Sequence, residues 1–118
     1  SYTVGLGGKG ANQAVAAARA GASVAFVGAV GSDAQGDAVL ANFAAYGIDT
    51  RSTARSVDEA TGVAIVLVDA RGSNEIIVAP GANADLPSAT VDAAIDTVTP
   101  VDVVVVQCEI PVASVEQI

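Results

Sequence analysis

The sequence predicts an α/β fold that carries a separate β-hairpin, and three observations support this prediction. Helix-forming segments alternate with short valine-rich runs, as they do when helices cover a parallel sheet. Those runs are apolar at nearly every position, which is typical of strands buried on both faces. Between them, two β-rich runs flank a glycine-containing turn, which is the pattern of an antiparallel hairpin.

The first half of the chain contains the pattern helix, strand, helix. Residues 12–20 are strong helix formers followed by a glycine, which predicts a short helix that ends there. Residues 23–30 form an apolar run bounded by glycines and predict a buried strand. Residues 35–46 place Val39, Leu40 and Phe43 at helical spacing, which predicts a second helix.

The middle of the chain changes character. Residues 51–60 are polar and predict a loop, whereas residues 61–69 and 74–80 are β-rich and predict the two strands of a hairpin. The turn between them contains Gly72. Because an antiparallel hairpin is a departure from the α/β order, we expect it to form a lid or an extension at the edge of the sheet.

The last third returns to the α/β pattern. Residues 87–98 have one apolar helical face, with the proline tolerated in the first turn, and predict a helix. Residues 101–106 include four consecutive valines and predict a fully buried parallel strand. Gln107 and Glu109 follow this strand, at the end where open α/β sheets place their ligands. Pro111 begins a further predicted helix.

Composition excludes several classes of function. The chain has 118 residues, 52% of them hydrophobic, and a net charge of -8, which disfavours nucleic acids and anionic membranes as partners. Its one cysteine and lack of histidine exclude an internal disulfide and disfavour a zinc site. No apolar stretch reaches the roughly 18 residues that a membrane helix needs. We therefore expect a protein of a reducing compartment, the cytoplasm.

A glycine-rich run near the start carries the main functional signal. Residues 5–10 match G-x-G-x-x-G, but a dinucleotide fingerprint also needs a long preceding strand and an acidic residue about 20 positions later. The context here lacks both features, which disfavours a dinucleotide-binding oxidoreductase. A Walker A loop is excluded because Lys9 is followed by Gly10 instead of serine or threonine. A plain tight turn stays open as an alternative.

Lys9 and Asn12 suggest a binding role for this run. They place a cation and an amide at a helix start, where glycines let a ligand approach the backbone. Such groups suit a ligand rich in hydroxyls, and a carboxylate such as Glu109 complements them by accepting hydrogen bonds. The alternative for Glu109 is an exposed acid at a strand end.

The same residues carry a resemblance to a known family. Residues 7–14, Gly-Gly-Lys-Gly-Ala-Asn-Gln-Ala, are similar to the first signature of the ribokinase and phosphofructokinase-B family of carbohydrate kinases. Further similar motifs follow in order along all 118 residues. They are Val27-Gly28, Gly31-Ser32-Asp33 with Gly36, Gly47-Ile48-Asp49, Thr61-Gly62-Val63-Ala64, Gly81-Ala82-Asn83 and Gln107-Cys108-Glu109.

The resemblance implies a three-layer, ribokinase-like α/β sandwich, with residues 61–80 as a β lid. It implies that residues 1–118 are the acceptor-sugar-binding portion of such a domain, and that the lid pairs two subunits into a homodimer. The sugar-binding residues that it implies are Gly8, Lys9, Asn12 and Glu109, together with the lid residues Ala64, Val66 and Val78. For the three lid residues, ordinary strand packing is the alternative role.

Two parts of the family pattern are not found in the chain. The family's first strand with its Asn-x-Asp pair is expected before residue 1, and the second signature, Asp-Thr-x-Gly-Ala-Gly-Asp, after residue 118. In the family the second signature supplies the catalytic base and the amides that hold the transferring phosphate. We therefore assign no catalytic, cofactor-binding or metal-binding residue here, and we expect the chain alone to be inactive.

For the whole protein, the resemblance implies ATP-dependent phosphorylation of a sugar. The Lys-Gly-Ala-Asn-Gln form of the signature favours D-ribose, giving ribose 5-phosphate, with ATP, Mg²⁺ and K⁺ as the implied cofactors. A kinase for another sugar or a nucleoside is one alternative. A sugar-binding module without catalysis is another.

Overall fold

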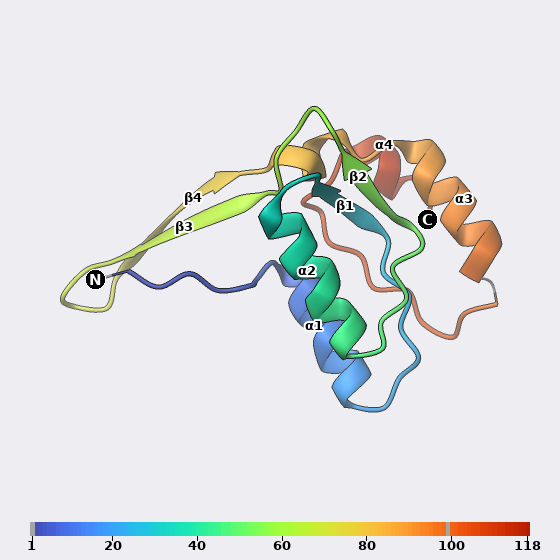
Figure 1. Ribbon diagram of the computed structural model, residues 1–118, viewed down its shortest axis with the longest axis horizontal. Coiled ribbons are helices and arrows are strands. Elements are labelled where there is room, and N and C mark those ends of the chain that lie inside the picture. Colours follow the sequence, from blue (N-terminus) through green and yellow to red (C-terminus); the bar gives the residue numbers. More distant parts are fainter. Residues whose placement is uncertain (1, 99) are drawn as a thin grey trace.

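A computed structural model describes residues 2–98 and 100–118 of the chain. Helices and strands alternate first, a long hairpin follows, and helices return near the end (Figure 1). In chain order the elements are α1 (Lys9–Arg19), β1 (Gly28–Gly31), α2 (Ala34–Ala45), β2 (Thr53–Ser56), β3 (Val63–Val68), β4 (Asn74–Ala79), the 3₁₀ helix η1 (Gly81–Asp85), α3 (Ser88–Val98) and α4 (Val112–Val115).

The body of the molecule has three layers with β1 and β2 in the middle. On one side, α1 and α2 enclose a core cluster that includes Ala14, Phe43 and Ile48. On the other side, Ala29 of β1 packs with Leu86 and with Val91 of α3. Figure 1 shows α1 and α2 on one side of the strands and α3 on the other. The predicted α/β sandwich is confirmed.

The predicted helices are confirmed with small shifts at their ends. α1 begins at Lys9, three residues before the predicted start, so its first turn includes the last two residues of the glycine-rich run, Lys9 and Gly10. α2 and α3 match their predicted ranges to within one residue, and α4 follows Pro111 as expected. The helix η1 was not predicted. Within residues 2–98 and 100–118, no helix is long and apolar enough to cross a membrane.

The sheet of the body corrects one prediction and refines another. β2 lies within the predicted loop 51–60 and pairs in parallel with β1, with Gly28 opposite Thr53. The loop prediction was wrong because a strand at the edge of a sheet forms through backbone pairing and can carry polar side chains. In addition, the Thr53 hydroxyl donates to the Phe26 carbonyl at 3.1 Å. The predicted strand 23–30 is shorter than expected, since regular pairing covers only β1, preceded by an isolated bridge between Ala25 and Asp49.

The valine run at residues 101–106 does not form the predicted buried strand. The structure assigns it no strand, and its side chains are largely exposed, with Val103 at 76%. None of the described residues pairs its backbone with this run. A strand exists only where another strand supplies hydrogen-bond partners, so an apolar sequence is not sufficient.

The predicted hairpin is confirmed. β3 and β4 pair in antiparallel register from Val63 opposite Ala79 to Val68 opposite Asn74. The turn closes through Asp69, whose carboxylate accepts from the Ser73 amide at 2.9 Å, and Gly72 there has a φ of 84°. Figure 1 shows the hairpin projecting away from the three layers. Every residue of both strands is exposed.

Candidate functional site

The start of α1 is built on a glycine and carries no side-chain cap. Gly8 precedes the helix with a φ of 96°, a conformation that favours glycine. Its carbonyl accepts from the Asn12 amide at 2.9 Å. Within the described part of the chain no side chain caps the helix, so the first-turn amides at the positive end of the helix dipole have no side-chain acceptor. Lys9, the first helical residue, adds a full positive charge.

Two predicted site residues that lie 100 positions apart meet at this helix start. The Lys9 ammonium group donates to the carboxylate of Glu109. A second contact joins the same two segments, because the Gln107 side chain donates from Nε2 to Oε1 of Gln13 at 2.8 Å. The segment that follows the valine run therefore lies against the first turns of α1.

The Lys9–Glu109 pair is open to water. The side chain of Lys9 is 69% exposed and that of Glu109 is 49% exposed. An ion pair as exposed as this contributes little to stability, and its partners exchange readily for other hydrogen-bonding groups. Together with Asn12, the pair offers both donors and acceptors within one small region. This arrangement suits a polar, uncharged ligand that carries several hydroxyl groups.

The three predicted lid residues share one face of the hairpin. Ala64 lies directly opposite Val78, and Val66 is two positions along the same strand, so the three side chains project to the same side. All three are exposed. The structure therefore groups them with one another but does not bury them against Lys9, Asn12 or Glu109.

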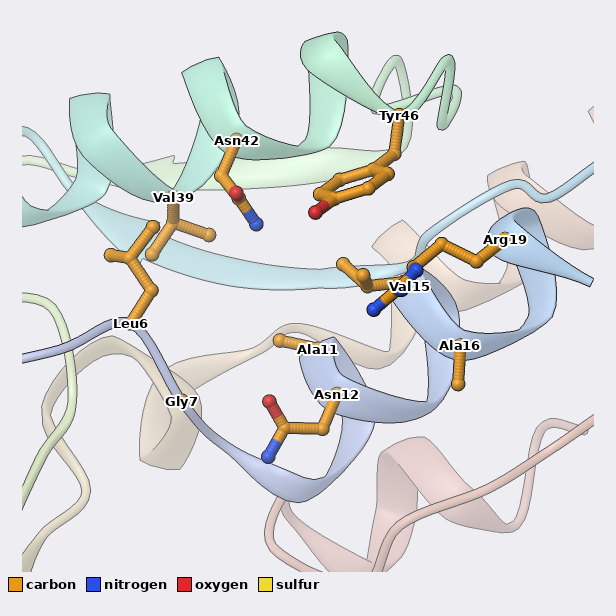
Figure 2. Close-up of a pocket in the computed structure, with 10 residues that line it drawn as sticks. All are labelled: Leu6, Gly7, Ala11, Asn12, Val15, Ala16, Arg19, Val39, Asn42 and Tyr46. Atoms are coloured by element: carbon orange, nitrogen blue, oxygen red, sulfur yellow. The ribbon is translucent and has the colours of Figure 1, made fainter.

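Sequence reasoning placed Gln107 at the ligand end of a predicted strand without giving it a role, and it missed Gln13, although both residues lie within the motifs quoted above. It also missed a shallow pocket of about 330 Å³ between α1 and α2. Figure 2 shows Leu6, Val15 and Val39 in this pocket, with polar side chains around them. Those polar residues are Asn12, Arg19, Asn42 and Tyr46. The helical spacing of Asn42 and Tyr46 was the one available signal, because it places them on one face of α2.

The carboxylates with shifted pKa values lie away from the start of α1. The Thr61 hydroxyl, which donates to Asp33, is the main cause of the lowered pKa of that carboxyl group. Hydrogen bonds from Arg51 lower the pKa of Asp49 to about 2. In the hairpin turn, the Ser73 amide is the main cause of the lowered pKa of Asp69. Each shift accompanies a local structural contact.

Among residues 2–98 and 100–118, no group of three or more Asp, Glu, Cys or His side chains is arranged to hold a metal ion. The described residues therefore offer no cluster of side chains that could hold a metal ion by itself.

Comparison with known proteins gives a consistent picture. A family model described as "pfkB family carbohydrate kinase" matches residues 1–118. A ribokinase of Haemophilus influenzae is 41% identical over 116 residues, which cover 98% of this chain and 38% of that protein. A ribokinase of Bacillus subtilis is 44% identical over 112 residues, covering 95% of this chain and 38% of that protein. The chain thus spans a little over a third of the length of these relatives.

Solved structures agree with the observed fold. The ribokinase of Thermotoga maritima matches with a TM-score of 0.81 and 38% identity, over 92% of this chain and 35% of that one. An Arabidopsis thaliana ribokinase in complex with ribose and ATP matches with a TM-score of 0.73 and 29% identity, over 94% of this chain and 38% of that one. The α/β architecture is therefore that of ribokinase-like folds.

Proposed function

This chain belongs to the pfkB family of carbohydrate kinases, and on that premise we propose that it is the acceptor-sugar-binding portion of an ATP-dependent sugar kinase. The proposed reaction of the whole protein is phosphorylation of D-ribose to ribose 5-phosphate. The observation that carries the proposal is the contact between Lys9 and Glu109, which brings two separately predicted sugar-binding residues together at the start of α1.

In this proposal each residue at the start of α1 makes a different kind of hydrogen bond to the sugar. Lys9 and the side-chain amide of Asn12 donate hydrogen bonds to sugar hydroxyl oxygens, and the carboxylate of Glu109 accepts from sugar hydroxyls. Gly8 has no side chain, so the sugar ring can approach the first-turn amides of α1. The sugar replaces the exposed Lys9–Glu109 contact, which costs little because that contact is weak in water.

The hairpin is proposed to cover the bound sugar. Ala64, Val66 and Val78 form an exposed apolar surface on one face, and an apolar cover would exclude water from the acceptor hydroxyl. Ile65, Leu67 and Ile77 alternate with them on the opposite face and are also exposed. We propose that this second face pairs with the hairpin of another subunit in a homodimer, which sedimentation analysis of the intact protein would test.

The nucleotide is assigned to the part of the kinase outside residues 1–118. ATP supplies the transferred phosphoryl group, with Mg²⁺ and K⁺ as the proposed ions. On this view residues 1–118 alone form no ADP when mixed with ribose, ATP and Mg²⁺. ADP formation above that of a Lys9→Ala control would contradict this expectation.

Calorimetric titration of the intact protein with ribose tests the sugar site. We expect Lys9→Ala and Glu109→Gln each to weaken ribose binding about 10- to 100-fold, because each removes hydrogen bonds to a charged group. The matched controls are Arg51→Ala, an exposed cation outside α1, and Glu116→Gln, another exposed acid. Both controls should bind ribose as the parent does.

The other outcomes separate the alternatives. Unchanged ribose affinity in both site variants would refute the proposed sugar site. Tighter binding of 2-deoxyribose or fructose than of ribose would retain the site and change the substrate. Ribose binding without ADP formation by the intact protein would favour a sugar-binding module that lacks catalysis.

A further inference from the structure

The base of the hairpin consists of residues 60–62, which lead into β3, and residues 80–81, which follow β4. A compact set of hydrogen bonds holds it. Asp33 precedes α2, and its Oδ1 accepts from the Gly36 amide at 2.7 Å, which caps that helix. The same carboxylate accepts from the Thr61 amide at 2.8 Å and from the Thr61 hydroxyl at 2.7 Å. The Thr61 oxygen in turn accepts from the Gly31 amide at 2.9 Å. One carboxylate and one hydroxyl thus join β1, α2 and the chain that enters β3.

Close backbone packing surrounds these bonds. A Cβ atom added to Gly31 would lie 2.5 Å from the Thr61 nitrogen, and one added to Gly36 would lie 2.2 Å from the Gly31 oxygen. Just beyond β4, at the start of η1, Gly81 has a φ of 52°, and its added Cβ would lie 2.2 Å from the Ala60 oxygen. The base of the hairpin therefore fits against the body without spare room.

Beyond the base, packing against the body does not hold the hairpin in place. All six residues of β3 and all six of β4 are exposed, and Figure 1 shows the two strands extending away from the layers. Six residues of strand span about 20 Å, so a rotation of about 10° at the base would move the far end by about 3.5 Å. The contacts at the base thus determine where the apolar face of the hairpin lies.

We propose that Asp33 and Thr61 are positioning residues that set the direction of the hairpin relative to the start of α1, and thereby the fit of the lid over a bound sugar. The part that concerns sugar rests on the function proposed above, whereas the part that concerns hairpin direction does not. Neither residue needs to touch the sugar. Asp33 is suited to this role because it caps α2 and holds Thr61 through the same carboxylate.

Two variants separate the Asp33–Thr61 hydrogen bonds, which position the hairpin, from the bond between Asp33 and Gly36, which caps α2. Thr61→Val keeps the shape of the side chain but removes the hydroxyl that joins Asp33 and Gly31, and Thr61→Ser retains that hydroxyl as the conservative control. Asp33→Ser retains a side-chain oxygen that can cap α2 through the Gly36 amide, but it lacks the second oxygen that holds the Thr61 amide. Circular dichroism establishes that each variant is folded.

Spin labels measure the direction of the hairpin in the intact protein. Labels at Ser73→Cys in the hairpin turn and Ala44→Cys on α2, in a background in which Cys108 and any other cysteine of the intact protein are replaced by serine, report the distance between the two regions by pulsed electron resonance. We expect a narrow distance distribution in the parent and in Thr61→Ser. We expect a broad or displaced distribution in Thr61→Val and Asp33→Ser.

Steady-state kinetics measure the consequence for the sugar. We expect Thr61→Val to raise the KM for ribose about tenfold while kcat changes less than twofold, because the hydroxyl acts on lid placement and leaves the reacting groups in place. Unchanged distance distributions in both variants would overturn the proposal, even if their melting temperatures fall. A parent that phosphorylates no sugar would refute the proposed function, while the distance measurements would still test hairpin direction.

Discussion

The three-layer body and the hairpin are both rich in apolar residues, but only the body buries them. Phe43 between α1 and α2 is fully buried, whereas Ile65 and Ile77 in the hairpin are more than half exposed. A two-stranded hairpin in water is marginally stable by itself, so this one depends on its base. The body therefore supplies the stability, while the hairpin leaves its apolar surface exposed.

The largest expected effect comes from the body's core. Phe43→Ala should lower the free energy of unfolding by about 3–5 kcal/mol, because it removes a fully buried aromatic side chain and leaves a cavity. The matched hairpin variant Ile76→Ala, opposite Val66 on the face that is not proposed to pair between subunits, should change it by less than about 0.5 kcal/mol, as exposed substitutions do. Urea denaturation of the two variants beside the parent measures both values. Similar losses at the two positions would contradict the division between a stabilising body and a dependent hairpin.

An intermediate effect is expected where the body meets the hairpin. Gly36→Ala improves helix propensity by about 1 kcal/mol, but its Cβ would lie 2.2 Å from the Gly31 carbonyl oxygen. We expect a net loss of about 1–3 kcal/mol, because neither backbone segment can move without disturbing Thr61.

Gly5→Ala is the control for that substitution, since nothing lies within 4 Å of a Cβ at this position. Thermal unfolding followed by circular dichroism compares the two variants with the parent. A Gly36→Ala protein as stable as the parent would mean that the junction between body and hairpin is looser than its contacts indicate.

The smallest effect is expected from a charge pair on the body's surface. Arg51 donates to Asp49 at 2.6 Å and lowers the pKa of that carboxyl group to about 2. Because the pKa is lowered in the folded state, the pair stabilises the protein above the ordinary aspartate pKa of 3.8 and loses this contribution as the pH falls through about 2. The parent should thus be slightly more stable than Asp49→Asn at pH 7, and the difference should disappear only as the pH falls below about 2.

Urea denaturation at several pH values measures that difference, and a double-mutant cycle assigns it. In an Arg51→Gln background, Asp49→Asn should have a smaller effect than in the parent. An effect of the same size in both backgrounds would show that the stabilisation arises from other contacts of Asp49, such as the bond that its carboxylate accepts from the Arg51 amide.

Several features were determined by the sequence alone because their signals are local. The helices at 12–20, 35–46 and 87–98 and the hairpin strands follow from periodicity and from glycines a few residues away, and the structure places them within a few residues of those ranges. The motif at residues 7–14 similarly indicated where α1 begins and which side chains lie there. These signals depend on the preferences of neighbouring residues and need no partner.

Other features were decided only by tertiary structure, because each depends on a partner distant in the sequence. β2 is a strand because β1 lies beside it, although its own residues are polar, and residues 101–106 are not a strand because no described backbone pairs with them. The meeting of Lys9 with Glu109 and of Asp33 with Thr61 likewise spans 100 and 28 positions. Hydrogen bonds and ion pairs form only where the fold brings both groups together, which local patterns do not specify.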